Sequence, residues 1–267
     1  MAGEPWDPAE RERKYRRRKR AGLTRIISEG DSWFDYPPHT NVIDWIDATE
    51  RFAIQRFEVS GDTIHNMEAT SDKVAAAVVS EQPLCVLLSA GGNDVVEEAF
   101  IKQLFVEHDP DLTPRQHLDA AQWQAKLDQL SRDFLHFMDD LGEHVPIIAH
   151  GYDYMPPSKK GAKYDGFRVS GPWVLPAMLA RHIDDPALQR AIVREMINDF
   201  NDLLAKMQTK YPLHFLHVDL RGAFVESDWL NEIHLKKSGF KRVAQALIAA
   251  IDNRLPAVLQ ARRDAGL

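Results

Sequence analysis

The stretch Ile26-Ile27-Ser28-Glu29-Gly30-Asp31-Ser32-Trp33 decides the interpretation of this chain. It is typical of an apolar strand that ends in a polar turn, with Ser32 just past the strand's carboxyl end. A histidine, His234, follows far downstream in Asn231-Glu232-Ile233-His234. Nucleophilic acyl transfer requires a serine hydroxyl and a histidine base, so these two residues are candidates for that pair.

Two further segments repeat the pattern of a strand followed by a polar turn. Val59-Ser60-Gly61-Asp62-Thr63 closes a strand-like run over 53–59 and precedes a helix-like stretch over 64–79. An apolar strand over 84–90 ends in Gly91-Gly92-Asn93-Asp94. In open α/β sheets ligands bind outside the carboxyl ends of the strands, so we expect the three polar clusters to converge on one crevice.

The rest of the chain continues the alternation of strands and helices. Strand candidates at 144–150 and 213–219 are separated from the others by helical stretches around 114–141 and 186–210. After His234, apolar residues spaced by three and four over 240–251 predict an amphipathic helix. This alternation predicts an α/β fold with a parallel sheet covered on both faces.

Ser32, Gly61, Asn93 and His234 stand in the order and context of four sequence blocks, and from Ile26 to about Ile251 the chain resembles the SGNH (GDSL-type) hydrolases. The resemblance implies a flavodoxin-like three-layer α/β/α sandwich with a mostly parallel sheet of about five strands. It also implies a serine esterase. The oxyanion hole would then be formed by the backbone N–H groups of Ser32 and Gly61 and the side-chain amide of Asn93.

The fourth block departs from the family pattern, which has an aspartate three residues before the histidine. Here that position is Asn231. An amide oxygen can accept the imidazole N–H but carries no charge, which weakens the triad. Asp228, six residues before His234, is an alternative third member, and a Ser–His dyad oriented by a backbone carbonyl is another. Position within the motif favours Asn231.

Aromatic residues near these blocks are candidates for substrate binding. Trp33 adjoins the nucleophile, and Tyr152 and Tyr154 lie in a long irregular stretch over 150–172 that follows a strand. We expect hydrolysis of small or medium acyl esters, with O-acetylated carbohydrates as a candidate substrate class. The alternative is a binding protein on a hydrolase scaffold, catalytically weakened by Asn231.

Composition supports a globular protein. A chain of 267 residues, 44% of them hydrophobic, can form one domain, which we place at 23–267 after a basic N-terminal arm at 1–22. Residues 1–20 carry eight Lys or Arg and four Asp or Glu, although the whole chain has a net charge of −7. No groove-binding motif accompanies the basic run, so we expect no nucleic-acid partner.

Several classes of protein are disfavoured by missing motifs. The sequence lacks metal-binding His-Glu-x-x-His and Cys-x-x-Cys, nucleotide-binding Gly-x-Gly-x-x-Gly and the Gly-x-Ser-x-Gly elbow, so we expect no metal and no cofactor. The single cysteine, Cys85, excludes a disulfide within the chain. Without a signal-like or membrane-spanning apolar run, we expect a soluble, cytoplasmic protein with no membrane partner.

Overall fold

The centre of the structure is a five-stranded sheet in which every neighbouring pair of strands is parallel. The computed structural model describes residues 7–37, 39–164 and 167–267. The strand order is β2-β1-β3-β4-β7, and the prediction of a mostly parallel sheet of about five strands is confirmed. These strands are β1 (Thr24–Gly30), β2 (Phe52–Arg56), β3 (Val86–Ser89), β4 (Ile147–His150) and β7 (Phe215–Val218).

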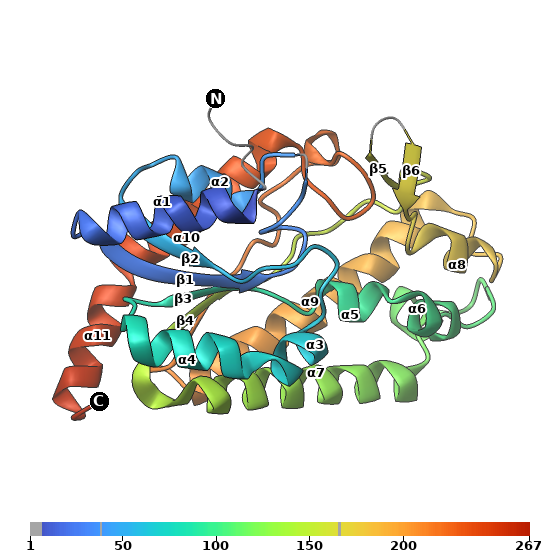
Figure 1. Ribbon diagram of the computed structural model, residues 1–267. Coiled ribbons are helices and arrows are strands. Elements are labelled where there is room, and N and C mark those ends of the chain that lie inside the picture. Colours follow the sequence, from blue (N-terminus) through green and yellow to red (C-terminus); the bar gives the residue numbers. More distant parts are fainter. Residues whose placement is uncertain (1–6, 38, 165–166) are drawn as a thin grey trace.

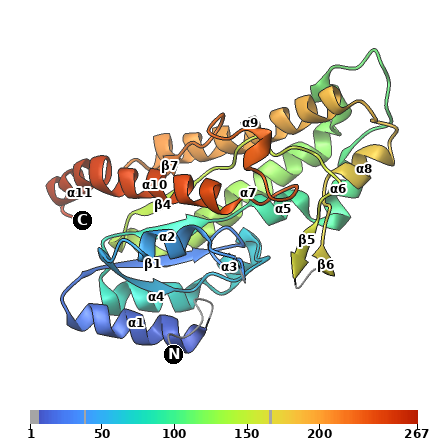
Figure 2. The same ribbon diagram turned by 90° about the horizontal axis from the view of Figure 1, so that it is seen from above.

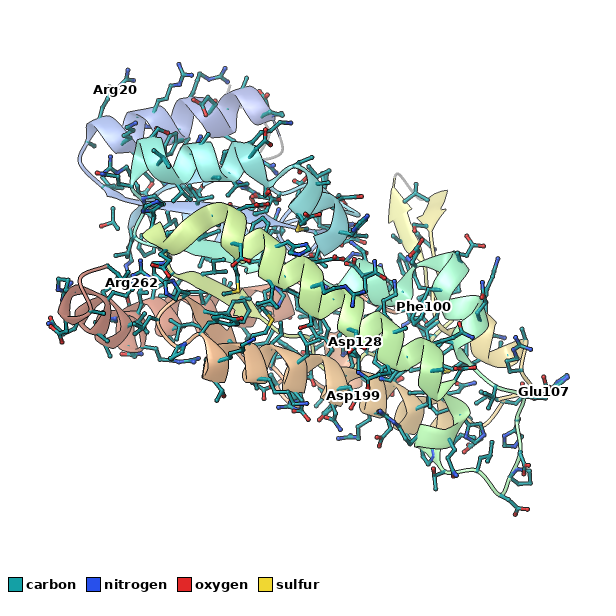
Figure 3. The ribbon with its side chains drawn as sticks, turned by 90° about the horizontal axis from the view of Figure 1, so that it is seen from below. Arg20, Phe100, Glu107, Asp128, Asp199 and Arg262 are labelled. Atoms are coloured by element: carbon teal, nitrogen blue, oxygen red, sulfur yellow. The ribbon has the colours of Figure 1, made fainter. Side chains whose placement is uncertain are left out.

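Helices cover both faces of the sheet and complete the three-layer sandwich (Figure 1). Helices α2 and α10 lie on one face, and α3, α4, α7 and α9 lie on the other, whereas α1 runs along the β2 edge (Figure 2). Figure 3 shows α7 and α9 side by side. The bounds are α1 (Pro8–Arg20), α2 (Val42–Asp47), α3 (Ile64–Ala69), α4 (Ser71–Glu81), α7 (Ala120–Leu141), α9 (Pro186–Lys210), α10 (Lys237–Asn253) and α11 (Leu255–Asp264).

The buried faces follow the sequence periodicity. Strands β3 and β4 are buried throughout, as expected for central strands covered on both faces. The helix predicted after His234 is α10, and it buries Phe240, Val243, Leu247 and Ile251 at spacings of three and four. The sheet and its helices therefore share one apolar core.

The structure adds detail to two segments near the N-terminal half of the sheet. The helix predicted over 64–79 is interrupted at Thr70, whose φ of −121° and ψ of 12° are not helical, so α3 and α4 are separate helices. Within the basic N-terminal arm, residues 8–20 form helix α1, in which Tyr15 and Arg18 are buried. The Arg18 guanidinium donates to the Phe52 carbonyl at 3.2 Å and fixes α1 to the edge strand.

The carboxyl ends of the strands carry the remaining elements. The order of strands reverses between β1 and β3, the position at which open α/β sheets form their ligand crevice. The stretch 150–172, expected to be irregular, contains the antiparallel hairpin of β5 (Ala162–Tyr164) and β6 (Phe167–Ser170). Beyond the same edge lie α5 (Gly92–Val96), α6 (Glu98–Leu104) and α8 (Leu175–Leu179) (Figure 1).

Short 3-10 helices occupy Pro114–His117, Gly142–His144 and Glu226–Asp228. The predicted helical stretch over 114–141 therefore begins with a 3-10 turn, and α7 proper starts at its N-cap Asp119. Among the residues that the structure describes, no helix combines the length and the apolar character needed to cross a membrane.

Candidate active site

Ser32 and His234 form a direct hydrogen bond at the carboxyl edge of the sheet. The Ser32 hydroxyl oxygen lies 2.7 Å from Nε2 of His234. The turn that carries Ser32 is fixed to β3, because the Asp31 N–H donates to the Ser89 carbonyl at 2.9 Å. Both Ser32 and His234 are buried, with 6% and 3% of their surface exposed. The structure therefore brings together the nucleophile and base expected from the sequence.

Asn231 holds the other side of the imidazole. Its side-chain oxygen lies 3.0 Å from Nδ1 of His234 and also accepts the backbone N–H groups of His234 at 2.8 Å and Ile233 at 3.1 Å. The Asn231 amide nitrogen donates to the Tyr36 hydroxyl at 3.2 Å. Because an amide oxygen only accepts, Nδ1 carries the proton and Nε2 is free to receive the proton of Ser32.

Asp228 does not contact His234. Its carboxylate accepts the Val225 N–H at 3.0 Å and pairs with the Arg242 guanidinium at 2.5 Å. These two interactions hold the pKa of Asp228 below its ordinary value. Of the two candidates for the third position, the structure brings Asn231, and not Asp228, to the histidine.

Two aromatic rings enclose His234. The Tyr36 ring stacks on the imidazole with 4.1 Å between centroids, and Trp173 meets it edge-on at 5.8 Å. Burial, with a smaller contribution from His39, lowers the pKa of His234 to about 3. The imidazole is therefore neutral at pH 7, which is the form that a general base needs. The contact of Tyr36 with His234 could not be predicted from the sequence, because no local pattern connects positions so far apart.

Gly61 and Asn93 line the same groove as Ser32 and His234. The Asn93 amide donates one N–H to the Asp62 carbonyl at 2.7 Å, which ties α5 to the Gly61 loop and leaves the second N–H for another acceptor. Gly61 adopts a φ of +85°, a conformation that favours glycine. The arrangement fits the oxyanion donors that the family resemblance implies.

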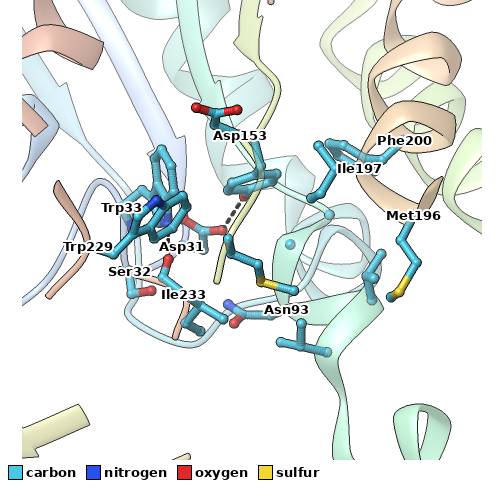
Figure 4. A pocket seen from close by; sticks show the side chains of 16 residues that line it. Asp31, Ser32, Trp33, Asn93, Asp153, Met196, Ile197, Phe200, Trp229 and Ile233 are labelled. Carbon is cyan, nitrogen blue, oxygen red and sulfur yellow. Dashed lines mark hydrogen bonds between the residues drawn. The ribbon is translucent and has the colours of Figure 1, made fainter. Parts of the chain in front are cut away.

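Ser32 lies at the junction of two cavities. One is a groove of about 1360 Å³ that runs past His234 toward the β5–β6 hairpin and α8. The other is a smaller, mainly apolar cavity of about 50 Å³ between the Ser32 turn and α9 (Figure 4). Four residues line both cavities: Ser32, Asn93, Val96 and Ile233.

The three aromatic residues proposed to bind substrate have different locations. Trp33 and Tyr152 are buried and line the smaller cavity, where the Tyr152 hydroxyl donates to Asp31 at 2.5 Å. Tyr154 instead points to α9, where its hydroxyl donates to the Asn198 side chain at 2.8 Å. Tyr154 is not among the described residues that line the groove or the cavity, so the structure does not bring it to the site.

Glu232, two positions before His234, holds the hairpin segment in place. Its buried carboxylate points away from His234 and accepts four backbone N–H groups, those of Ser158, Trp173, Val174 and Leu175. The Glu232 N–H also donates to the Lys160 carbonyl at 3.1 Å. One residue thus binds both ends of the segment that carries the β5–β6 hairpin and forms one side of the groove.

Comparison with known proteins finds likeness in structure and not in sequence. No model of a known protein family matches the sequence, and no curated protein matches it. The lipase Lip_vut3 from a goat rumen metagenome is similar with a TM-score of 0.56 and 12% identity, over 87% of this chain and 100% of that chain. A member of the lipolytic G-D-S-L family from Veillonella parvula has a TM-score of 0.51 and 14% identity, over 86% and 100%.

A gut microbial diltiazem-metabolizing enzyme is similar with a TM-score of 0.53 and 13% identity over 86% of this chain. The chain spans about half of that enzyme, 47% of its length. At these identities the likeness shows the fold. The chain has the three-layer α/β/α fold of the GDSL-type, or SGNH, hydrolases, as the sequence motifs predicted.

Asn231→Asp tests the uncharged third position. A carboxylate at this position favours the imidazolium, so the pKa of His234 rises and turnover of p-nitrophenyl acetate increases about tenfold or more. At acid pH, kcat/KM falls because the base becomes protonated. The acid limb of the pH profile of kcat/KM should therefore move up by about 1–3 pH units. The pH profile of kcat/KM for both proteins measures the shift.

The matched control is Asp228→Asn, which removes a carboxylate from the same loop without touching His234. We expect turnover within about threefold of the original, since the lost interactions are at a distance from the reacting atoms. A collapse of activity in Asp228→Asn, with no gain in Asn231→Asp, would reverse the assignment of the third residue.

Glu232→Gln tests the hold on the hairpin segment. The new amide presents N–H groups to backbone donors, so we expect a loss of about 1–3 kcal/mol in the free energy of unfolding. The Michaelis constant for esters of large alcohols should rise about tenfold because the groove wall is released, while kcat for p-nitrophenyl acetate changes less. Urea unfolding and steady-state kinetics measure both, with the exposed Glu226→Gln as control.

Proposed function

We propose that this protein is a serine esterase that cleaves acyl esters through a covalent acyl-enzyme on Ser32. The observation that carries the proposal is the 2.7 Å contact between the Ser32 hydroxyl and Nε2 of a buried, neutral His234. The lipolytic proteins among the structural neighbours support the same reaction class. Fold alone does not establish function, so the proposal depends on the geometry of the site.

The reaction follows from this geometry in two halves. Nε2 of His234 removes the Ser32 proton as the serine oxygen attacks the ester carbon, and the carbonyl oxygen becomes an oxyanion. The N–H groups of Ser32, Gly61 and Asn93 stabilise that charge. His234 then protonates the leaving alcohol, and the C–O bond breaks. A water molecule, deprotonated by His234, attacks the acyl-enzyme and releases the carboxylic acid and free Ser32.

We propose O-acetylated carbohydrates as the substrate class. The groove has a volume of about 1360 Å³, which is much larger than a simple alcohol requires. Its lining combines the aromatic side chains of Tyr36 and Trp173 with polar groups, an environment suited to a sugar that presents apolar faces and hydroxyls. The polar side chains include those of Ser60, Thr63, Lys102 and Lys163.

A second candidate function is binding without efficient turnover, and the uncharged Asn231 favours it. Replacing the acid of a serine protease triad by an amide lowers turnover about ten-thousand-fold. A protein with this site that hydrolysed no ester would retain the groove as a ligand site. Reactivity of the serine distinguishes the two functions.

Ser32→Ala and His234→Ala should each remove nearly all hydrolysis of p-nitrophenyl acetate, because catalytic partners act as a unit. The original protein should be labelled by a fluorophosphonate probe, and Ser32→Ala should not. The exposed Ser227→Ala is the control and should react normally. Normal turnover in a folded Ser32→Ala protein would contradict the mechanism, and absence of both labelling and turnover in the original protein would favour binding.

Asn93→Ala should lower kcat for p-nitrophenyl acetate about 100- to 1000-fold with little change in the Michaelis constant, because the donor acts on charge that develops in the transition state. Steady-state kinetics separate the two constants. Asn66→Ala, at an exposed position of α3, is the control. A loss confined to the Michaelis constant would make Asn93 a substrate-binding residue instead.

A further inference from the structure

We infer that the small apolar cavity beside Ser32 is an acyl site for chains from acetyl to butyryl, and that the groove receives the alcohol. The inference rests on the proposed esterase function and adds the acyl specificity. Ser32 and Asn93 line both spaces, so an ester carbon attacked by Ser32 has one substituent on each side of this junction. The position of His234 decides which substituent of the ester lies in the groove and which lies in the cavity.

His234 has to deliver a proton to the leaving oxygen, so the alcohol must lie on the side of the imidazole. His234 lines the groove and is not among the described residues that line the cavity. Gly61, with the second backbone donor, also faces the groove. The acyl chain must then extend in the other direction, into the cavity between the Ser32 turn and α9 (Figure 4).

The walls of the cavity are apolar and buried. They come from α5, from the loop after β4 and from one face of α9, whose side chains close the end opposite Ser32 (Figure 4). The main wall residues are Val95, Val96, Met155, Met196, Ile197 and Phe200, each less than 10% exposed. A hydrocarbon chain gains stability by burial against such a surface, whereas a sugar would lose its hydrogen bonds there.

The two carboxylates at the cavity already have partners. Asp31 accepts hydrogen bonds from the Ser89 hydroxyl at 2.7 Å, the Trp33 N–H at 2.9 Å and the Tyr152 hydroxyl. Asp153 accepts three backbone N–H groups, those of Tyr154, Gly222 and Phe224. Neither carboxylate needs a polar ligand, so the cavity selects for an apolar chain.

The size of the cavity sets the chain length. Its volume is about 50 Å³. One water-sized group needs roughly 10–15 Å³ on this scale, so the cavity holds about three to five such groups. The methyl of acetyl and the propyl chain of butyryl fit within that limit. An octanoyl chain exceeds it and requires the walls to move.

Hydrolysis of p-nitrophenyl acetate, butyrate and octanoate tests the acyl site. In the original protein we expect kcat/KM for acetate and butyrate to exceed that for octanoate about 100-fold. Met196→Ala enlarges the cavity and should raise the octanoate-to-acetate ratio about tenfold. Met207→Ala is the matched control, since Met207 is a buried methionine on the same helix and is not among the described residues lining the cavity. The octanoate-to-acetate ratio of Met207→Ala should not differ from that of the original protein.

Ile197→Phe provides the opposite change. The larger ring fills the cavity and should lower the butyrate-to-acetate ratio about tenfold, so the inference is tested even if one variant fails to fold. Efficient octanoate hydrolysis by the original protein, or chain-length ratios unmoved in both variants, would overturn the acyl site while leaving the esterase intact. Absence of turnover on all three esters, with no fluorophosphonate labelling, would instead overturn the proposed function.

Discussion

The site exists because every strand of the sheet runs in the same direction. Ser32 and His234 are 202 positions apart, yet their side chains are hydrogen-bonded. Parallel strands end at one edge, so the loops after β1, β2 and β3 and the segment after β7 reach the same crevice. The strand order reverses between β1 and β3. Ser32 and Asn93 line a common groove at this position.

The chemistry of this crevice depends on an imidazole that is held by neutral groups. Asn231 fixes the tautomer of His234 without supplying charge, and burial favours the uncharged ring. A cation that forms there is stabilised by the face of Tyr36, stacked at 4.1 Å, and such contacts contribute about 0.5–2 kcal/mol. In the proposed reaction, His234 is therefore a base that resists protonation, and Tyr36 stabilises its imidazolium form to a modest extent.

The polar turns after the strands could be predicted because their residue types are unusual next to apolar runs, and the same contrast identifies Ser32 and Asn93 in the sequence. Position within the motif favours Asn231 over Asp228, but the ion pair that holds Asp228 to Arg242 of α10 could not be predicted from the sequence. The wall of the cavity could not be predicted either. Residues such as Met196 form the apolar stripe of α9, and periodicity cannot distinguish a stripe that lines a cavity from one that fills a core.

The four backbone hydrogen bonds to Glu232 hold the hairpin segment beside the His234 turn without using a side chain of that segment. The carboxylate recognises backbone N–H groups and no side chain, so the anchoring is independent of the sequence between positions 161 and 172. Both anchor points therefore depend on the backbone near Ser158 and Trp173 and not on side chains of the hairpin. Side chains that the hairpin presents to the groove can accordingly differ without changing the hydrogen bond between Ser32 and His234.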